Sequence, residues 1–192
     1  IARITSEAVK NDIKIGYLKP LDERVEPYGL YSNPARRIVL RTLTSTTDEE
    51  SLVDVRVPIA KLRQVKQQCE VDAIQQAIDV TADALDTVKS QLQSFENEKD
   101  IERALSAHFY GKADGHAYEP IIAGGKNAAV IHYTSNSQSL EPGDLMLLDV
   151  GALHNRYAAD ISRTWSIGTG APTQRQKDIH AHVLQVQHYA MG

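Results

Sequence analysis

The chain has 192 residues, of which 42% are hydrophobic, and this is enough apolar material for the core of one large or two small domains. Its 21 Lys and Arg residues are outnumbered by 25 Asp and Glu residues, and the net charge of -4 argues against nucleic acid as a partner. No apolar run is long enough to span a bilayer and no signal-peptide pattern is present, so we expect a soluble protein with no membrane partner.

Cys69 is the single cysteine, which excludes an intrachain disulfide and favours a reducing compartment, so we expect a cytoplasmic location. The sequence begins at Ile1 rather than Met, and it stops at Gly192 within or just after a helical pattern. We therefore expect both ends to be cut from a longer protein.

The first 57 residues mix short elements with turn signals. Turns are predicted at Asn33-Pro34 and Asp48-Glu49, and strands are predicted over residues 37–43 and 52–57. Because the residue before a proline disfavours helix, Val57-Pro58 predicts a boundary between a small α/β unit and a second domain over residues 58–192.

Helical periodicity dominates the next part of the chain. Asn97, followed by Glu98 and Asp100, predicts the start of a second helix that ends near Gly111, and Thr173 with Gln176 forms a capping box that predicts a last helix to Met191. A long amphipathic helix precedes these two, and its apolar residues are spaced by three and four. These residues are Val71, Ile74, Ala77, Ile78, Ala82, Leu85, Val88, Leu92 and Phe95.

Between the second and the last helix, the pattern is typical of strands. We predict strands over residues 121–122, 129–133, 145–150 and 157–167. The fold class expected for this region is therefore α+β.

Asp149 interrupts an apolar strand that we expect to be buried on both faces. An ionised carboxylate there is costly unless it is protonated, paired with a cation or bound to a metal. A hairpin centred on His154-Asn155 would place Asp160 directly opposite, with Cβ atoms roughly 4.5–5.5 Å apart. The two charges would repel by about 3 kcal/mol at an effective dielectric constant near 20, and a divalent cation would reverse this.

A simpler alternative stays open at this point. Asp149 could cap a turn before Gly151, and Asp160 could pair with Arg156 or Arg163. Two carboxylates are also too few ligands for a closed zinc site or for a two-metal centre.

Four ordered motifs resemble the catalytic domain of the aminopeptidase P and prolidase family. They are Ile121-Ile-Ala-Gly-Gly-Lys-Asn127, Ile131-His-Tyr-Thr134, Gly143-Asp-Leu-Met-Leu-Leu-Asp-Val-Gly151 and Tyr157-Ala-Ala-Asp-Ile-Ser-Arg-Thr164. The resemblance implies that residues 58–192 form the first half of a pita-bread metallopeptidase domain, and that residues 1–57 are the tail of the preceding α/β domain. Methionine aminopeptidase and creatinase share this fold.

The resemblance also implies roles for three residues. Asp149 would chelate one of two divalent metal ions, Asp160 would bridge both, and His132 would contact the substrate or the tetrahedral intermediate. From its neighbours alone, the sequence favours a core histidine at His132, flanked by Ile131 and Tyr133. The remaining ligands in the family, one His and two Glu, do not match His180, His182 or His188, which fall on an ordinary helix.

The activity implied is hydrolysis of Xaa-Pro bonds by an aminopeptidase or dipeptidase. Its substrate would be a peptide with proline at the second position, its nucleophile would be a hydroxide held between two metal ions, and manganese is favoured over cobalt or zinc. We expect the 192 residues alone to be inactive, and the protein could form a homo-oligomer. The alternatives are a non-catalytic binding or scaffold module and a creatinase-like amidinohydrolase.

Overall fold

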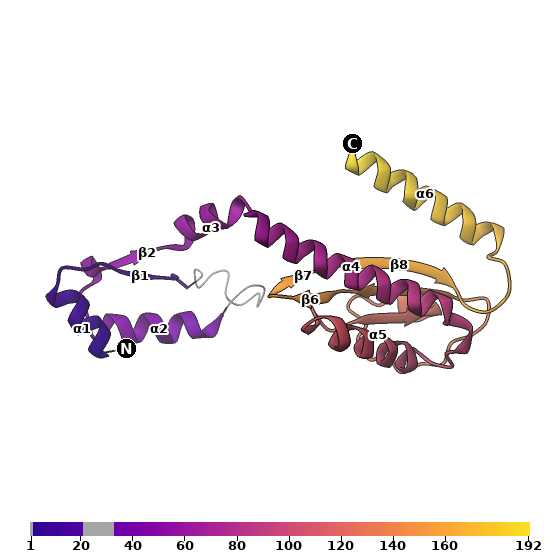
Figure 1. Cartoon of the computed structure of the whole chain (residues 1–192), viewed down its shortest axis with the longest axis horizontal. Helices are drawn as coiled ribbons and strands as arrows, with labels where there is room; N and C mark the ends of the chain where they lie inside the picture. Colours follow the sequence, from indigo (N-terminus) through magenta and orange to yellow (C-terminus); the bar gives the residue numbers. More distant parts are fainter. Residues whose placement is uncertain (1, 21–32) are drawn as a thin grey trace. The chain divides into compact units, whose positions relative to one another are not determined.

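The computed structural model describes residues 2–20 and 33–192, and the chain divides into two compact units between Lys66 and Gln67 (Figure 1). Within the described residues, none of the helices combines the length and the apolar character needed to cross a membrane. Each unit is described by itself below.

In its described residues, 2–20 and 33–66, the first unit contains helical segments and a small parallel sheet. Its elements are α1 (Ala2–Lys10), β1 (Ile15–Tyr17), α2 (Pro34–Thr44), the 3-10 turn η2 (Glu49–Ser51), β2 (Leu52–Asp54) and α3 (Arg56–Gln64). Strands β1 and β2 pair in parallel, with Ile15 opposite Leu52. This mixture agrees with the small α/β unit expected from the sequence.

Two sequence predictions in this unit are wrong. Residues 37–43 lie in α2 rather than in a strand, because the Asn33 side chain accepts a hydrogen bond from the Ala35 amide and Pro34 fills the first helical position. The strand predicted over residues 52–57 ends at Asp54, and Pro58 lies in the first turn of α3, where no amide hydrogen is required. The domain boundary predicted after Val57 stays a proposal.

The helices predicted for the second unit are confirmed. They are α4 (Gln68–Ser90), followed by the 3-10 turn η3 (Leu92–Ser94), α5 (Glu98–Lys112) and α6 (Gln174–Met191). The Asn97 side chain caps α5 by accepting from the Asp100 amide at 3.1 Å. The capping box of Thr173 and Gln176 opens α6 as predicted.

Six short strands form two antiparallel sheets in the second unit (Figure 1). The strands are β3 (Gly115–His116), β4 (Ile121–Gly124), β5 (Leu145–Val150), β6 (Ala152–His154), β7 (Tyr157–Ala158) and β8 (Ile161–Ser166). One sheet has the order β3-β6-β7 and the other has the order β4-β5-β8. The second sheet carries Asp149 on its central strand.

Two strand predictions require correction here. Residues 129–133 form the end of the 3-10 segment η4 (Gly125–Ala129) and a turn, with Ile131 87% exposed rather than buried in a sheet. The strand predicted over residues 157–167 is interrupted at Ala159 and Asp160, where the chain passes from β7, paired with β6, to β8, paired with β5.

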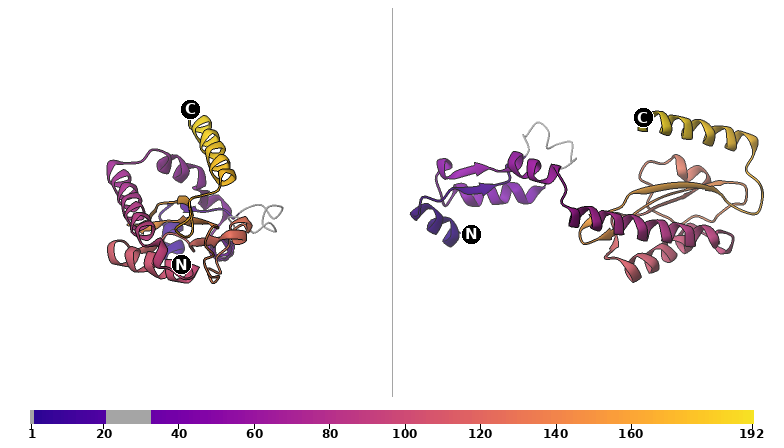
Figure 2. Two further views of the ribbon diagram at one scale, coloured as in Figure 1. Left: turned by 90° about the vertical axis from the view of Figure 1, so that its right-hand side faces the viewer. Right: turned by 45° about the horizontal axis from the view of Figure 1, so that its top comes forward.

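The core lies between one face of the β4-β5-β8 sheet and the helices α4 and α5, which lie on the same side of the strands (Figure 2). The α5 side chains Ile101, Leu105 and Phe109 are fully buried, as are Met146 and Leu148 of β5. The opposite face of β5 is half-buried and carries Asp149. The expectation that both faces of β5 are buried is therefore wrong, because only alternate residues face the core.

Candidate metal centre

Asp149 and Asp160 converge on the hydroxyl group of Tyr118. The Tyr118 oxygen lies 2.6 Å from Oδ1 of Asp149 and 3.0 Å from Oδ1 of Asp160. Asp149 is half-buried near the end of β5, whereas Asp160 is exposed just before β8. The structure therefore brings both predicted metal ligands together around one atom.

The register of the hairpin differs from the predicted one. Asp149 pairs with Ser162, and His154 pairs with Tyr157, so the turn is centred on Asn155-Arg156 rather than on His154-Asn155. Both turn residues have left-handed backbone conformations, with φ of 49° and 69°, as a type I′ turn requires. Asp160 is then a diagonal neighbour of Asp149, and diagonal neighbours remain within reach of each other.

Gly151 permits the close approach of the chain segments that carry the two aspartates. A Cβ atom at this position would lie 1.8 Å from the carbonyl oxygen of Ala159 and 3.2 Å from a ring carbon of Tyr118. No side chain other than hydrogen fits there without moving the backbone next to Asp160. Gly151, two residues after Asp149, is thus required because a larger residue would overlap the backbone of Ala159.

Tyr118 is in its protonated form at this site. Burial, together with the neighbouring Asp149 and Asp160 carboxylates, raises the pKa of its phenol far above the ordinary value. The phenol carries a single proton, so it donates to one carboxylate at a time or shares the proton between them. A neutral donor thereby reduces the cost of holding two carboxylates close together.

The alternative pairing with arginine is not observed. Asp160 accepts from Tyr118, and the Arg163 guanidinium donates to the carbonyl of its neighbour Ser162 at 2.9 Å. Over residues 2–20 and 33–192, neither Asp149 nor Asp160 takes part in an ion pair with a basic side chain. Among the described residues, the two carboxylates therefore have no cationic side chain to neutralise them.

His132 lies in the turn after η4 and has a left-handed backbone, with φ of 55°. Its side chain is exposed, so it is not a core histidine. The next residue, Tyr133, donates a hydrogen bond from its hydroxyl to Glu98 at 2.7 Å. The turn is therefore anchored beside His132, while the imidazole is left accessible.

The donor set fits part of a divalent metal site. Carboxylate oxygens suit hard and borderline cations, and both oxygens here already meet at one point. No group of three or more His, Cys, Asp or Glu side chains that could hold an ion occurs among the described residues. His180, His182 and His188 are exposed on α6.

Tyr118 and Glu98 were not identified from the sequence. Tyr118 reaches the aspartates because β4, which starts three residues later, pairs with β5 so that Ile121 lies opposite Asp149. That long-range pairing has no local signal in the sequence. The sequence indicates Glu98 only as a favourable acid at a helix start, whereas the structure shows a completely buried side chain.

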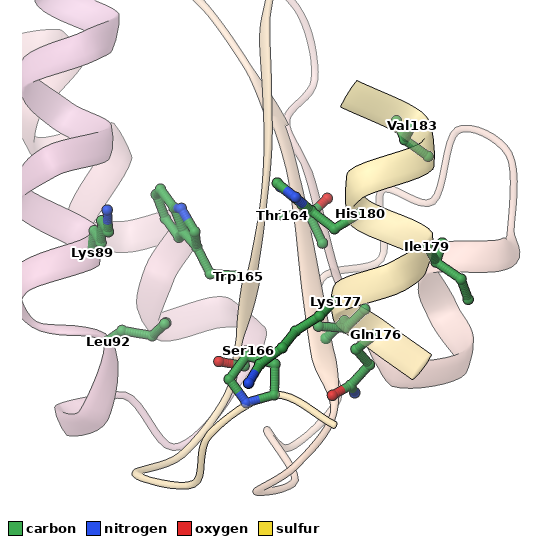
Figure 3. A pocket seen from close by; sticks show the side chains of 12 residues that line it. Lys89, Leu92, Thr164, Trp165, Ser166, Gln176, Lys177, Ile179, His180 and Val183 are labelled. Atoms are coloured by element: carbon green, nitrogen blue, oxygen red, sulfur yellow. The ribbon is translucent and has the colours of Figure 1, made fainter. Parts of the chain in front are cut away.

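An apolar cavity of the second unit lies elsewhere. It has a volume of about 580 Å³ and includes neither aspartate. Figure 3 shows side chains of α4 and β8, among them Lys89 and Trp165, on one side of it and those of Ile179 and Val183 from α6 on the other. The Lys89 ammonium lies 5.9 Å from the centre of the Trp165 ring.

Comparisons with known proteins agree with the motifs. Residues 72–192 match the metallopeptidase family M24. The Xaa-Pro aminopeptidase of Haemophilus influenzae is 34% identical over 151 residues, which are 77% of this chain and 34% of that protein. The chain therefore spans about a third of the length of this relative.

Solved structures show the same fold. The X-Pro aminopeptidase of Thermotoga maritima superposes with a TM-score of 0.74 and 25% identity over 97% of this chain and 49% of its own. The Xaa-Pro dipeptidase of Bacillus anthracis gives a TM-score of 0.78 over 97% of this chain and 48% of its own, and at 21% identity it supports the fold alone. The chain belongs to metallopeptidase family M24 and to its aminopeptidase P and prolidase group, and it has the α+β fold of the first half of the pita-bread domain.

Proposed function

We propose that this chain is part of a dinuclear metal-dependent peptidase that hydrolyses Xaa-Pro bonds, as an Xaa-Pro aminopeptidase or dipeptidase. The observation that carries the proposal is the convergence of Asp149 and Asp160 on the Tyr118 hydroxyl in a chain of family M24. Two carboxylates that lack a basic partner in the part of the chain that the structure describes are suited to bind divalent cations.

Asp149 and Asp160 would hold two divalent metal ions, with Asp149 on one ion and Asp160 bridging both. Manganese is the proposed metal, and cobalt and zinc are the alternatives. When bound, such ions lower the pKa of a water molecule and polarise the carbonyl group of the scissile peptide bond. Tyr118 would orient the two carboxylates through its hydroxyl before the metal binds and would limit their repulsion.

His132 would act on the substrate rather than on the metal. It is exposed in a turn that is anchored through Tyr133, so its imidazole can reach a bound peptide and donate a hydrogen bond to the oxygen on which negative charge develops. The proposed substrate is a peptide with proline at its second position. A cytoplasmic location and assembly into a homo-oligomer also belong to this proposal.

The 192 residues alone should bind metal weakly and should not turn over. Two carboxylates are fewer ligands than a two-metal centre needs, and the described residues offer no third His, Cys, Asp or Glu beside them. Measurable Xaa-Pro cleavage by this chain by itself would contradict this part of the proposal.

The principal test changes Asp160 to Asn in the protein expressed from its complete gene. We expect the variant to lose most of its bound manganese, measured by atomic emission after desalting, and its cleavage of Xaa-Pro peptides to fall by at least about 10²-fold. Removal of metal from the unmodified protein should abolish cleavage, and added manganese should restore it.

Asp86→Asn is the matched control, since it makes the same change at an exposed position of α4. It should leave both metal content and cleavage unchanged. A protein that binds no divalent ion and in which Asp160→Asn changes nothing would be a non-catalytic binding or scaffold module. Cleavage of creatine instead of Xaa-Pro peptides would identify a creatinase-like amidinohydrolase.

A further inference from the structure

Glu98 is a fully buried carboxylate whose contacts extend beyond its own helix. It is the first residue of α5 and has no exposed surface. Its Oε1 accepts from the Gly124 amide at 2.8 Å and from the Asn127 side chain at 3.1 Å. Its Oε2 accepts from the Tyr133 hydroxyl at 2.7 Å and from the Gln138 amide at 3.0 Å.

Glu98 also accepts a hydrogen bond from β4 that a neighbouring strand would accept in a larger sheet. Strand β4 is at the edge of its sheet, so alternate amides on its outer side need acceptors other than β5. Gly124 finds one in Glu98, and Ile122 finds one in the Asn136 side chain at 3.1 Å. Two side-chain oxygens thus close the outer edge of β4.

The same carboxylate fixes the segment that carries His132. Three of its four donors, on Asn127, Tyr133 and Gln138, belong to residues 125–140, which we call the His132 loop. Tyr133 directly follows His132, whose own side chain has no hydrogen bond or ion pair within residues 2–20 and 33–192. The position of the His132 backbone therefore depends on the hydrogen bond between Tyr133 and Glu98.

We infer that Glu98 is a positioning residue that sets the place of His132 through Tyr133 and the His132 loop. The inference rests on the proposed function, because a consequence for cleavage requires that His132 contacts the substrate. Glu98 itself is too deeply buried to touch a peptide. Its effect must therefore be transmitted through the loop.

A carboxylate is required for this role because it accepts at both oxygens and donates at neither. Glu98→Gln keeps the shape of the side chain but leaves one acceptor oxygen, and it points an NH2 group at two donors. The contact with the backbone amide on that side, of Gly124 or of Gln138, is then lost because an amide N–H can only donate, and the neighbouring side chain must reorient to accept. Tyr133→Phe is a milder change, because it removes one hydroxyl donor and keeps the ring.

The first test measures hydrogen exchange in this chain. Glu98→Gln should accelerate exchange of the amides of residues 124–138 and leave those of β5 unchanged. Glu96→Gln makes the same change of charge two residues earlier at an exposed position and should have no effect. Unchanged exchange in the His132 loop, or equal acceleration in β5, would overturn the inference.

The second test is a double-mutant cycle in the protein expressed from its complete gene. Glu98→Gln should lower kcat for an Xaa-Pro peptide by about 10²-fold, the scale of loss that a displacement of about 1 Å produces, with a much smaller change in KM. In a His132→Ala background, the same change should add no further loss, because its target is gone. Tyr133→Phe should show the same dependence and also serves if Glu98→Gln folds poorly.

Additive losses in this cycle would show that Glu98 acts independently of His132, and the inference would be wrong. A protein with His132 intact that does not cleave Xaa-Pro peptides would instead contradict the proposed function. In that case the exchange measurement still decides whether Glu98 holds the loop. The two failures are therefore distinguishable.

Discussion

Gly151 controls how closely the chain segments bearing Asp149 and Asp160 approach each other. We expect Gly151→Ala to destabilise the protein by about 1–3 kcal/mol, because its Cβ would overlap the Ala159 carbonyl and push apart a packed region. Urea unfolding followed by circular dichroism measures this change. The variant should also bind less manganese, since Asp160 directly follows Ala159.

Gly111→Ala is the control for this substitution. Gly111 lies in α5, and an added Cβ there has no atom within 4 Å, so the change should stabilise the protein by about 0.5–1 kcal/mol. Destabilisation of equal size at both positions would show that the close contact at Gly151 is not the cause.

We expect His116 to make the stability of the protein depend on pH. Burial lowers the pKa of its imidazole, whereas the nearby Glu102 raises it, and the net shift is downward from 6.5. The unfolded chain therefore binds a proton more readily than the folded one as the pH falls below 6.5. The free energy of unfolding should be highest above pH 6.5. It should then decrease as the pH falls, until the pH is below the pKa of His116 in the folded state.

Thermal unfolding, measured from about pH 7.5 to about pH 5, checks this expectation because the range brackets the ordinary pKa of histidine. His116→Gln keeps a polar group near Ser106, whose hydroxyl lies 2.8 Å from the imidazole Nε2. It should flatten the pH dependence. A profile identical to that of the unmodified protein would assign the effect to other groups.

The sequence alone predicts some of the residues that form the candidate metal site, but not all of them. Asp149 stands out because a carboxylate interrupts an apolar strand, and Asp160 follows from the hairpin and the family motif. Tyr118 could not be found, since its approach to both carboxylates depends on which strand pairs with β5. Local patterns do not encode that choice.

The turn between β6 and β7 explains why the predicted register was wrong. Asn155 and Arg156 both have positive φ, and the usual Gly that marks such a turn is absent. The turn therefore could not be located to within one residue from composition. Asp149 and Asp160 still meet because a shift of two residues preserves the face of the sheet.

This turn leads to a prediction at the scale of the hairpin. Arg156→Gly should stabilise the protein by about 0.5–1 kcal/mol, because glycine adopts the left-handed conformation without the Cβ conflict of arginine. Urea unfolding measures the change. Arg163→Gly, within strand β8, should destabilise instead, and a gain in stability there would point to loss of charge rather than backbone relief.

Helices were predicted more reliably than strands because their ends carry local chemistry. The caps at Asn97 and Thr173 mark α5 and α6 at the correct residues. The same chemistry at Asn33-Pro34 was read as a turn, although an Asn followed by Pro equally begins a helix. Val130 and Ile131 look like a strand, but they have no pairing partner in the sheet and remain exposed.

At the scale of the whole chain, the described residues of the two units differ in how many buried apolar side chains they contribute. The hydrophobic cluster of the second unit joins α4, α5 and both strands of the β4-β5 pair, whereas Leu43 is the buried apolar residue described for the first unit. The family match likewise begins at residue 72, within the second unit. Fold class and family were predictable from the second unit, because its motifs and its core coincide.

The amides on the outer edge of β4 already have hydrogen-bond acceptors, and this affects where another strand can pair with the sheet. Glu98 and Asn136 already occupy the amides to which another strand would bind on that side. Strand β8 forms the other edge of the β4-β5-β8 sheet, so we expect an additional strand to pair along β8 rather than along β4. Strand β8 begins directly after Asp160, so a strand added there would run beside the element that follows this carboxylate.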